Sequence, residues 1–300
     1  MWTGILAGLG AGALWGIVFL APKALPGFAA LDVTASRFVV YGLVAVAMMA
    51  WRLNMRRLPS WRHALAALGL SVLGFTGYYL LLVLAIRDMG VAMPALIIGT
   101  IPIWVMLLGK PQGLRWGALL PGLALTAGGL WLMAVSPAPY HATANSAVPA
   151  NDGRGWLWIL IALASWTAFA LLNAAWLKRH PHVHAGDWAN WLGLATGLGG
   201  LWLWLAAGTP LAQLAAMPDI GLFVLMALAM GFGSSWLATV LWNVASQRLP
   251  ASLCGQLIVS ETLFALLYAF AWDGSWPSAA QWLAVLLFTL GILASIRAHR

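Results

Sequence analysis

The chain has 300 residues, of which 63% are hydrophobic and only 7% are charged, and its mean hydropathy is +0.90. A soluble protein carries about a quarter charged residues, so this composition excludes an ordinary globular domain. The net charge of +8 does not indicate a nucleic-acid-binding protein, because the basic residues are spread over many turns without a stripe of interleaved aromatic residues.

Apolar runs of about twenty residues recur along the chain, which is the length that one helix needs to cross a bilayer core about 30 Å thick. We predict ten such helices, which place both termini on the same side of the membrane. In chain order they cover residues 3–22, 32–51, 64–86, 90–108, 115–135, 156–177, 187–207, 219–243, 251–271 and 279–297. No basic segment precedes the first apolar run, so a cleavable signal peptide is not expected.

The charges between the predicted helices indicate an orientation, because basic loops remain in the cytoplasm. Four basic residues fall on the side opposite the N-terminus, together with five acidic ones. Eleven basic residues fall on the N-terminal side: Arg52, Arg56, Arg57, Arg62, Lys110, Arg115, Lys178, Arg179, Arg248, Arg297 and Arg300. We therefore expect a multi-pass protein of the bacterial inner membrane with both termini in the cytoplasm.

The longest hydrophilic stretch divides the chain into similar halves. We predict a first five-helix repeat at residues 1–137, a periplasmic linker at 138–154 and a second five-helix repeat at 155–300. Ala13-Leu14-Trp15-Gly16 and Ala164-Ser165-Trp166-Thr167 occupy matching places in the two halves. Five is an odd number, so equivalent helices run in opposite directions, as in many secondary transporters. The predicted fold is an all-α integral membrane protein whose ten transmembrane helices form two inverted-topology repeats around a central cavity.

The last two predicted helices carry the most specific pattern. It comprises Ala245, Leu249-Pro250-Ala251-Ser252, Gly255, Glu261, Phe264-Ala265, Gly274, Pro277-Ser278, Gln281-Trp282 and Gly291-Ile292. This pattern resembles the C-terminal repeat of the EamA-type branch of the drug/metabolite transporter superfamily. The many tryptophans and the start Gly12-Ala13-Leu14-Trp15-Gly16 are similar to the YddG amino-acid exporters within that branch. The resemblance implies a cavity lined by helices 1–4 and 6–9, peripheral helices 5 and 10, and export of amino acids, aromatic ones included.

Aromatic residues inside the predicted helices are the first candidates for substrate binding. Trp15, Trp166 and Trp236 lie well within their helices, whereas most other tryptophans fall near helix ends. An indole ring offers a stacking face and an N–H donor, so each of the three either lines the substrate path or packs between helices. Tyr78 and Tyr79 are neighbours that diverge by about 100° on a helix, so we expect only one of them to face the cavity.

Polar residues inside the predicted helices are the second group of candidates. Asn173, Ser235 and Gln256 either contact substrate or form hydrogen bonds between helices. Glu261 is the only ionisable residue deep within a predicted span, where a lone charge is costly. Its carboxyl group either couples transport to protons, or binds a substrate ammonium, or stays neutral and bonds to helix backbone. For Asp32 and Arg37, near the outer end of the second helix, we predict a surface ion pair, with a substrate latch as the alternative.

Glycine and proline give the candidates for helix packing and gating. Gly8 and Gly12 belong to a series that recurs every four residues and lets another helix approach closely, either as static packing or as a seam that slides during transport. Pro94 and Pro102 in the fourth helix remove backbone donors, so we expect kinks there that either gate the cavity or are static.

The function favoured by these observations is a secondary transporter that exports amino acids, aromatic and other neutral ones, by alternating access. The alternative is a drug/metabolite exporter for hydrophobic cations, with Glu261 as counter-charge. An intramembrane enzyme would require paired carboxylates, histidine or lysine at one membrane face, which the sequence lacks. No cofactor, metal or nucleic acid is expected. We expect a monomer whose partners are its small-molecule substrate and membrane lipid.

Overall fold

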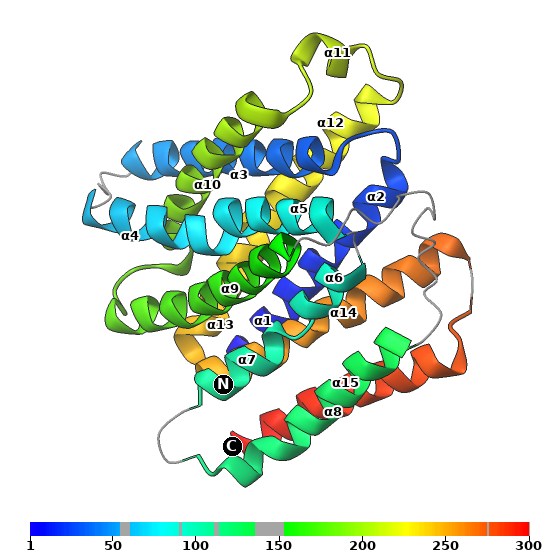
Figure 1. The fold of residues 1–300 in the computed structure, drawn as a ribbon. Coiled ribbons are helices and arrows are strands. Elements are labelled where there is room, and N and C mark those ends of the chain that lie inside the picture. Colours follow the sequence, from blue (N-terminus) through cyan, green and yellow to red (C-terminus); the bar gives the residue numbers. More distant parts are fainter. Residues whose placement is uncertain (55–60, 90–91, 111–113, 136–152, 275, 300) are drawn as a thin grey trace.

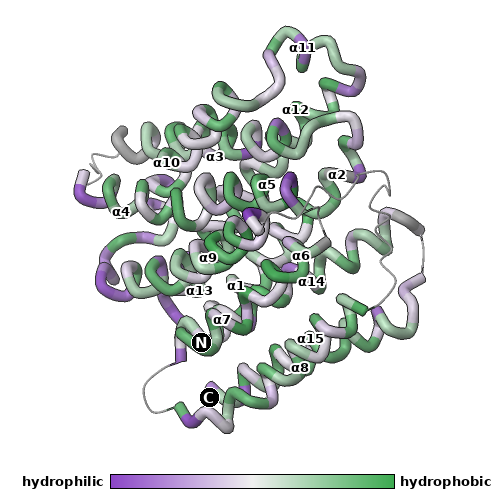
Figure 2. Tube along the Cα trace, viewed as in Figure 1, coloured by the Kyte–Doolittle hydropathy of each residue, from purple (hydrophilic) through white to green (hydrophobic). Residues whose placement is uncertain are grey.

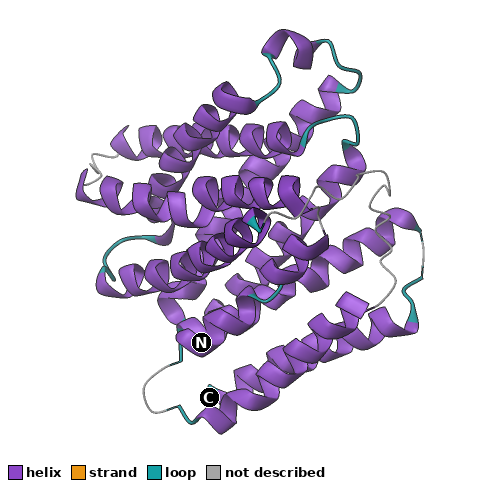
Figure 3. Ribbon diagram, in the orientation of Figure 1, coloured by secondary structure: helices purple, strands orange, loops and turns teal. Residues whose placement is uncertain are grey.

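The computed structural model describes residues 1–54, 61–89, 92–110, 114–135, 153–274 and 276–299. Within these ranges the regular secondary structure is entirely helical, and the helices pack side by side in one bundle (Figures 1 and 3). Most of the predicted linker, residues 138–152, lies outside the described residues, as do Arg56, Arg57 and Arg300.

Within the described residues, each of the ten predicted spans overlaps with helix. The elements in chain order are α1 (Trp2–Gly16), η1 (Ile17–Leu20), α2 (Ala21–Ala24), α3 (Ala30–Asn54), α4 (Trp61–Ser71), η2 (Val72–Thr76), α5 (Gly77–Met89), α6 (Ala92–Ile98), α7 (Ile101–Leu108), α8 (Trp116–Val135), α9 (Arg154–Arg179), α10 (Ala185–Ala207), α11 (Leu211–Ala215), α12 (Ile220–Ala229), η3 (Met230–Leu237), α13 (Ala238–Arg248), α14 (Ala251–Asp273) and α15 (Ala279–Ala298).

In the part of the chain that the structure describes, eight helical segments are long and apolar enough to cross a membrane. They are Trp2–Leu20, Ala30–Trp51, Trp61–Met89, Trp116–Val135, Arg154–Arg179, Ile220–Arg248, Ala251–Trp272 and Ala279–Ala298. Two of the ten predicted spans are not among these eight segments. The fourth corresponds to the shorter apolar stretch Met93–Leu108. The seventh corresponds to α10, which has 23 residues and carries Asp187 and Asn190. Figure 2 shows hydrophobic residues along the helices and hydrophilic ones concentrated at their ends.

Four of the spans depart from a regular α-helix. The first contains the 3-10 segment η1. The third and eighth contain the π-helical segments η2 and η3, which the sequence did not predict. The fourth is broken between α6 and α7 at Gly99 and Thr100, directly before Pro102. Proline lacks the N–H that would bond to the carbonyl four residues earlier, which explains the break. Pro94 lies in the first turn of α6, where that N–H has no helical partner, and it causes no break.

Close helix pairs hold the bundle together. The most extensive contact joins α3 and α10, whose backbones meet at Gly42 and Gly197: a Cβ atom added to Gly197 would lie 2.6 Å from the Cα of Gly42. Helix α14 packs against α1 and α7, and α5 packs against α9. Helices α8 and α15 pack on each other along one edge of the bundle, in the peripheral place expected for them (Figure 1).

Both chain termini lie at the same end of the bundle (Figure 1). At that end, the Ser252 N–H donates a hydrogen bond to the carbonyl of Gly109 (3.2 Å), and the Ser252 side chain bonds to His299 (2.7 Å). A Cβ atom on Gly4 would lie 2.8 Å from Leu249. The start of α1, the end of α7, the turn between α13 and α14, and the end of α15 therefore meet there. We call this the terminal end of the bundle.

Candidate functional site

Three tryptophans from three helices meet in the middle of the bundle. The ring of Trp15 on α1 lies 6.5 Å from Trp166 on α9 and 5.4 Å from Trp242 on α13, between ring centroids, and Trp166 lies 6.4 Å from Trp242. The sequence predicted the first two but missed Trp242, which is 1% exposed. The indole nitrogen of Trp242 is buried without a hydrogen-bond partner, as is the hydroxyl of Ser235 seven residues earlier on the same helical face.

Trp236, also expected near the cavity, is fixed to a neighbouring helix. Its indole N–H donates to the side-chain oxygen of Asn190 on α10 (2.8 Å), and its ring stacks on Phe232 with 5.3 Å between centroids. The protein itself therefore satisfies the polar atom of this tryptophan, in contrast to Trp242.

Asn173 forms part of a buried network that connects three helices. Its side chain donates to the side-chain oxygen of Asn243 (3.1 Å) and accepts from the indole of Trp188 (2.7 Å). Asn243 in turn donates to the carbonyl of Ala185 (3.3 Å). The network ties α9, α13 and the start of α10 together. It uses the hydrogen-bonding capacity of Asn173 between helices, so these contacts favour the structural alternative for this residue.

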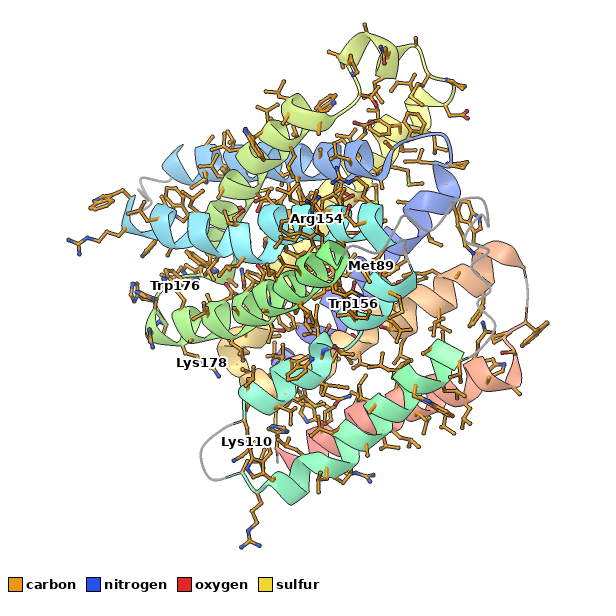
Figure 4. All side chains as sticks on the ribbon, in the orientation of Figure 1. Met89, Lys110, Arg154, Trp156, Trp176 and Lys178 are labelled. Carbon is orange, nitrogen blue, oxygen red and sulfur yellow. The ribbon has the colours of Figure 1, made fainter. Side chains whose placement is uncertain are left out.

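Figure 4 locates the network along the bundle. Trp176, whose ring stacks on Trp188 with 3.5 Å between centroids, and Lys178 lie toward one end of α9. Met89, Arg154 and Trp156 lie toward the other end (Figure 4). Trp188 is thus held near the C-terminal end of α9.

Gln256 lies between α14 and the peripheral helices. Its amide nitrogen donates to the Thr126 hydroxyl on α8 (2.9 Å), and its oxygen accepts from the Ser295 hydroxyl on α15 (3.1 Å). All three side chains are buried. These contacts also favour the structural alternative, because they attach the α8–α15 pair to α14.

The two neighbouring tyrosines on α5 have different surroundings. The Tyr79 hydroxyl donates to the carbonyl of Ala30 at the start of α3 (2.7 Å). Tyr78 is partly buried beside an apolar cluster that includes Ile159. The protein backbone therefore holds the hydroxyl of Tyr79.

The predicted ion pair between Asp32 and Arg37 is wrong. Asp32 is 2% exposed, and its two carboxylate oxygens accept hydrogen bonds from the backbone N–H (2.9 Å) and the hydroxyl (2.6 Å) of Thr209. Among the described residues, Arg37 forms no ion pair or hydrogen bond with Asp32 or with Glu261, and its Nε atom is buried without a partner.

The sequence comparisons agree with this helical architecture. Residues 2–134 match the EamA-like transporter family. The chain is also 32% identical over 316 residues to the inner membrane protein YtfF of Escherichia coli (strain K12), a similarity that covers 99% of this chain and 96% of YtfF. The chain belongs to the EamA-like transporter family. A protein of known crystal structure, 20% identical, has the same fold with a TM-score of 0.75 over 99% of this chain and 98% of its own length.

Membership of the EamA-like family confirms the resemblance found in the sequence. It identifies the chain as a membrane transporter of the drug/metabolite transporter superfamily rather than a member of an enzyme family.

In this EamA-type transporter the glycine series of α1 forms its contact with α14. A Cβ atom on Gly8 would lie 2.6 Å from the Leu257 side chain, and one on Gly12 would overlap the Ser260 hydroxyl. Gly16 faces Phe264 and Ala265 in the same way. The two helices are thus in contact along most of α1, as a packing or a sliding seam requires.

Gly8→Leu distinguishes a static seam from a sliding one. The Leu257 side chain can shift at its flexible end, so we expect folded protein to be retained while uptake into liposomes falls about tenfold, because the larger side chain prevents α1 from moving along α14. Gly117→Leu, which has open space around its Cβ position, is the control and should transport normally. Loss of folded Gly8→Leu protein would favour static packing.

Burial along α14 changes abruptly at Glu261. Every residue from 252 to 260 is buried, whereas residues 261 to 265 are all only partly buried. The buried half belongs to the largest hydrophobic cluster, which joins α1, α7, α9, α13 and α14 near the terminal end. Around α14 the bundle is therefore closely packed toward the terminal end, which we call its closed half, and more loosely packed beyond Glu261.

Proposed function

We propose that the protein exports amino acids, aromatic and other neutral ones, from the cytoplasm by alternating access. The group of Trp15, Trp166 and Trp242 carries this proposal. It combines aromatic faces with the unpartnered N–H of Trp242 in the middle of the bundle. Aromatic pairs contribute about 0.5–1.5 kcal/mol beyond their burial, so these rings suit contact with an aromatic or apolar side chain.

The charges of the interior support a substrate without phosphate groups. Phosphorylated substrates are normally held by several arginine or lysine side chains. Among the described residues, the charged side chains that lie more than one turn inside a helix are Arg37 and Glu261, which have opposite signs. A neutral or zwitterionic substrate fits this balance best.

The helix contacts support two inverted repeats of five helices, and hence ten crossings. The contacts α3–α10, α7–α14 and α8–α15 each join a helix of the first half to its counterpart in the second. Segment η2 of the third span packs on α9 and α10, the first two helices of the second half. Segment η3 of the eighth span, its counterpart, packs on α1 and α3, the first two long helices of the first half. Both π-helical segments also contain a Gly-Phe pair, Gly74-Phe75 and Gly231-Phe232.

The terminal end of the bundle is proposed to face the cytoplasm of a bacterial cell. Lys110, Arg248 and Arg297 lie at this end, and basic residues remain on the cytoplasmic side. YtfF is an inner membrane protein, which supports the same location for this chain. In this orientation the closed half of the bundle is the cytoplasmic half.

Reconstitution into liposomes with a panel of labelled amino acids tests the proposal. We expect saturable uptake of aromatic and other neutral amino acids, down their gradient or with a pH gradient. Trp166→Ala should lower the uptake of aromatic amino acids about tenfold, the change that corresponds to about 1.4 kcal/mol of lost contact. The control Trp131→Ala removes a tryptophan that is 66% exposed on the peripheral helix α8, and it should leave uptake unchanged.

The alternative substrate class is a hydrophobic organic cation, with Glu261 as its counter-charge. It is favoured by one observation: Glu261 is partly buried, and its carboxylate forms no hydrogen bond or ion pair with a described residue. Uptake of an organic cation together with uptake of none of the amino acids would replace the first proposal by this one. The proton-coupling role of Glu261 is tested by comparing the response to a pH gradient. If Glu261→Gln responds to the gradient in the same way as the parent, Glu261 does not couple transport to protons.

A further inference from the structure

One face of the eighth span, Ile220–Arg248, carries a row of buried polar groups that have no partner. Ser235, Thr239, Trp242 and Ser246 follow one another at intervals of four, three and four residues, so their side chains lie on the same side of the helix. Each is at most 3% exposed, and among the described residues none of their polar side-chain atoms forms a hydrogen bond. We call these four residues the polar row. It extends about 16 Å along the helix axis, given a rise of about 1.5 Å per residue.

The hydroxyl groups of the polar row differ from other hydroxyl groups in this bundle. A helical serine or threonine can bond to a backbone carbonyl of the preceding turn, as Ser260 does with Leu257 (2.6 Å) and Thr289 does with Val285 (2.8 Å). None of the three hydroxyls in the polar row does so. A buried polar group without a partner is costly, and its presence calls for a role. In a transporter, the role that fits is contact with a polar ligand that passes through the bundle.

The polar row connects the tryptophan group to the terminal end of the bundle. Trp242 belongs to both, since its ring lies 5.4 Å from Trp15 and 6.4 Å from Trp166. At the other end of the row, the two residues that follow Ser246 line a pocket of about 280 Å³. The residues that line this pocket are Leu177, Lys178, Pro181, Gln247 and Arg248. The row therefore leads from a basic pocket at the terminal end to the tryptophans in the middle of the bundle.

We propose that Thr239 and Trp242 bind the carboxylate group of the transported amino acid, and that Ser246 and Ser235 continue its path on either side. This inference rests on the proposed amino-acid function. The indole N–H of Trp242 can only donate a hydrogen bond, so its ligand must supply an acceptor. Thr239, one turn earlier on the same face, adds a hydroxyl that can also donate. A carboxylate offers two acceptor oxygens, and the neighbouring tryptophan rings remain available for the side chain of the amino acid.

Removing the hydroxyl of Thr239 while keeping the shape of its side chain tests the inference. Thr239→Val should weaken the binding of phenylalanine to the purified full-length protein about tenfold, because a hydrogen bond to a charged group is lost. The binding of phenethylamine, which has the same aromatic side chain but no carboxylate, should stay within about twofold of the parent. The unfolding temperature should stay the same or rise, because the variant removes a buried polar group that has no partner.

Thr126→Val is the matched control. Thr126 is also a buried threonine within a helix, but its hydroxyl accepts a hydrogen bond from Gln256 (2.9 Å). The same substitution should therefore lower the unfolding temperature and leave the binding of phenylalanine unchanged. Trp242→Phe is the second variant of the site, because it removes the indole N–H and keeps an aromatic ring. It should lower the ratio of phenylalanine affinity to phenethylamine affinity about tenfold.

The outcomes distinguish this inference from the function on which it rests. If the parent takes up no amino acid in liposomes, the proposed function fails, and the carboxylate site fails with it. If it takes up an amino acid other than phenylalanine, that amino acid and its decarboxylated amine replace the two probes. If uptake is observed but Thr239→Val and Trp242→Phe leave the ratio of the two affinities unchanged, only the carboxylate site is overturned. A Thr239→Val protein that is not recovered, or that unfolds at a lower temperature as Thr126→Val does, shows a structural role for this hydroxyl and also overturns the site.

Discussion

Replacing Gly197 with leucine is expected to destabilise the protein strongly and to lower its yield. At the crossing of α3 and α10, a Cβ atom on Gly197 would lie 2.6 Å from the Cα of Gly42 and 3.1 Å from its backbone nitrogen. Both are backbone atoms within helices, so neither can move aside as the end of a side chain can. We expect a cost at or above the upper end of the usual range for overpacking, about 1–3 kcal/mol, against a total stability of about 5–15 kcal/mol.

The measurement is the yield of monodisperse protein after purification, followed by its thermal unfolding. Gly69→Leu is the control: Gly69 is also inside a helix, but nothing lies within 4 Å of its Cβ position. It should give parental yield, because leucine also has the higher helix propensity. A Gly197→Leu protein that is recovered in parental yield and unfolds at the parental temperature would show that this crossing does not hold the bundle together.

The spans were predictable because the bilayer imposes a simple rule on the sequence. Every backbone group of a membrane-crossing segment must be satisfied internally, so a long apolar run is a helix. The break before Pro102 was predictable for the same reason, since proline removes one backbone donor. The π-helical turns η2 and η3 were not predictable, because the glycine that both contain is also frequent in regular membrane helices.

The site was predictable only where position within one helix is informative. Trp15 and Trp166 stand well inside the predicted spans 3–22 and 156–177, and both belong to the central tryptophan group. Trp242 was missed because the predicted helix ended at residue 243, whereas α13 continues to Arg248 and places this ring inside the bundle. The tertiary contact of Asp32 with Thr209, 177 residues away, decided the environment of Arg37, and no local spacing predicts it.

Cys254, the chain's one cysteine, is expected to report the opening of the closed half of the bundle. It is 2% exposed within the fully buried stretch of α14, whereas Phe264 on the same helix is partly buried. The comparison is a Phe264→Cys, Cys254→Ala double variant, whose one cysteine is at position 264. Without substrate, a maleimide should react with Cys254 at least about 100-fold more slowly than with that cysteine. This ratio corresponds to a free energy of opening of about 2.8 kcal/mol or more. Labelling is followed by mass spectrometry.

In this structure α1, α7 and α13 bury residues 252 to 260 of α14. Alternating access therefore requires this segment to separate from those helices in every cycle. A transported substrate lowers the barrier between the two states, so saturating substrate should speed the labelling of Cys254 while leaving that at position 264 unchanged or slower. Denatured protein, in which both thiols react alike, provides the reference. If Cys254 stays protected while the same preparation transports substrate, the contact between α1 and α14 does not open, and the gate must lie between other helices of the bundle.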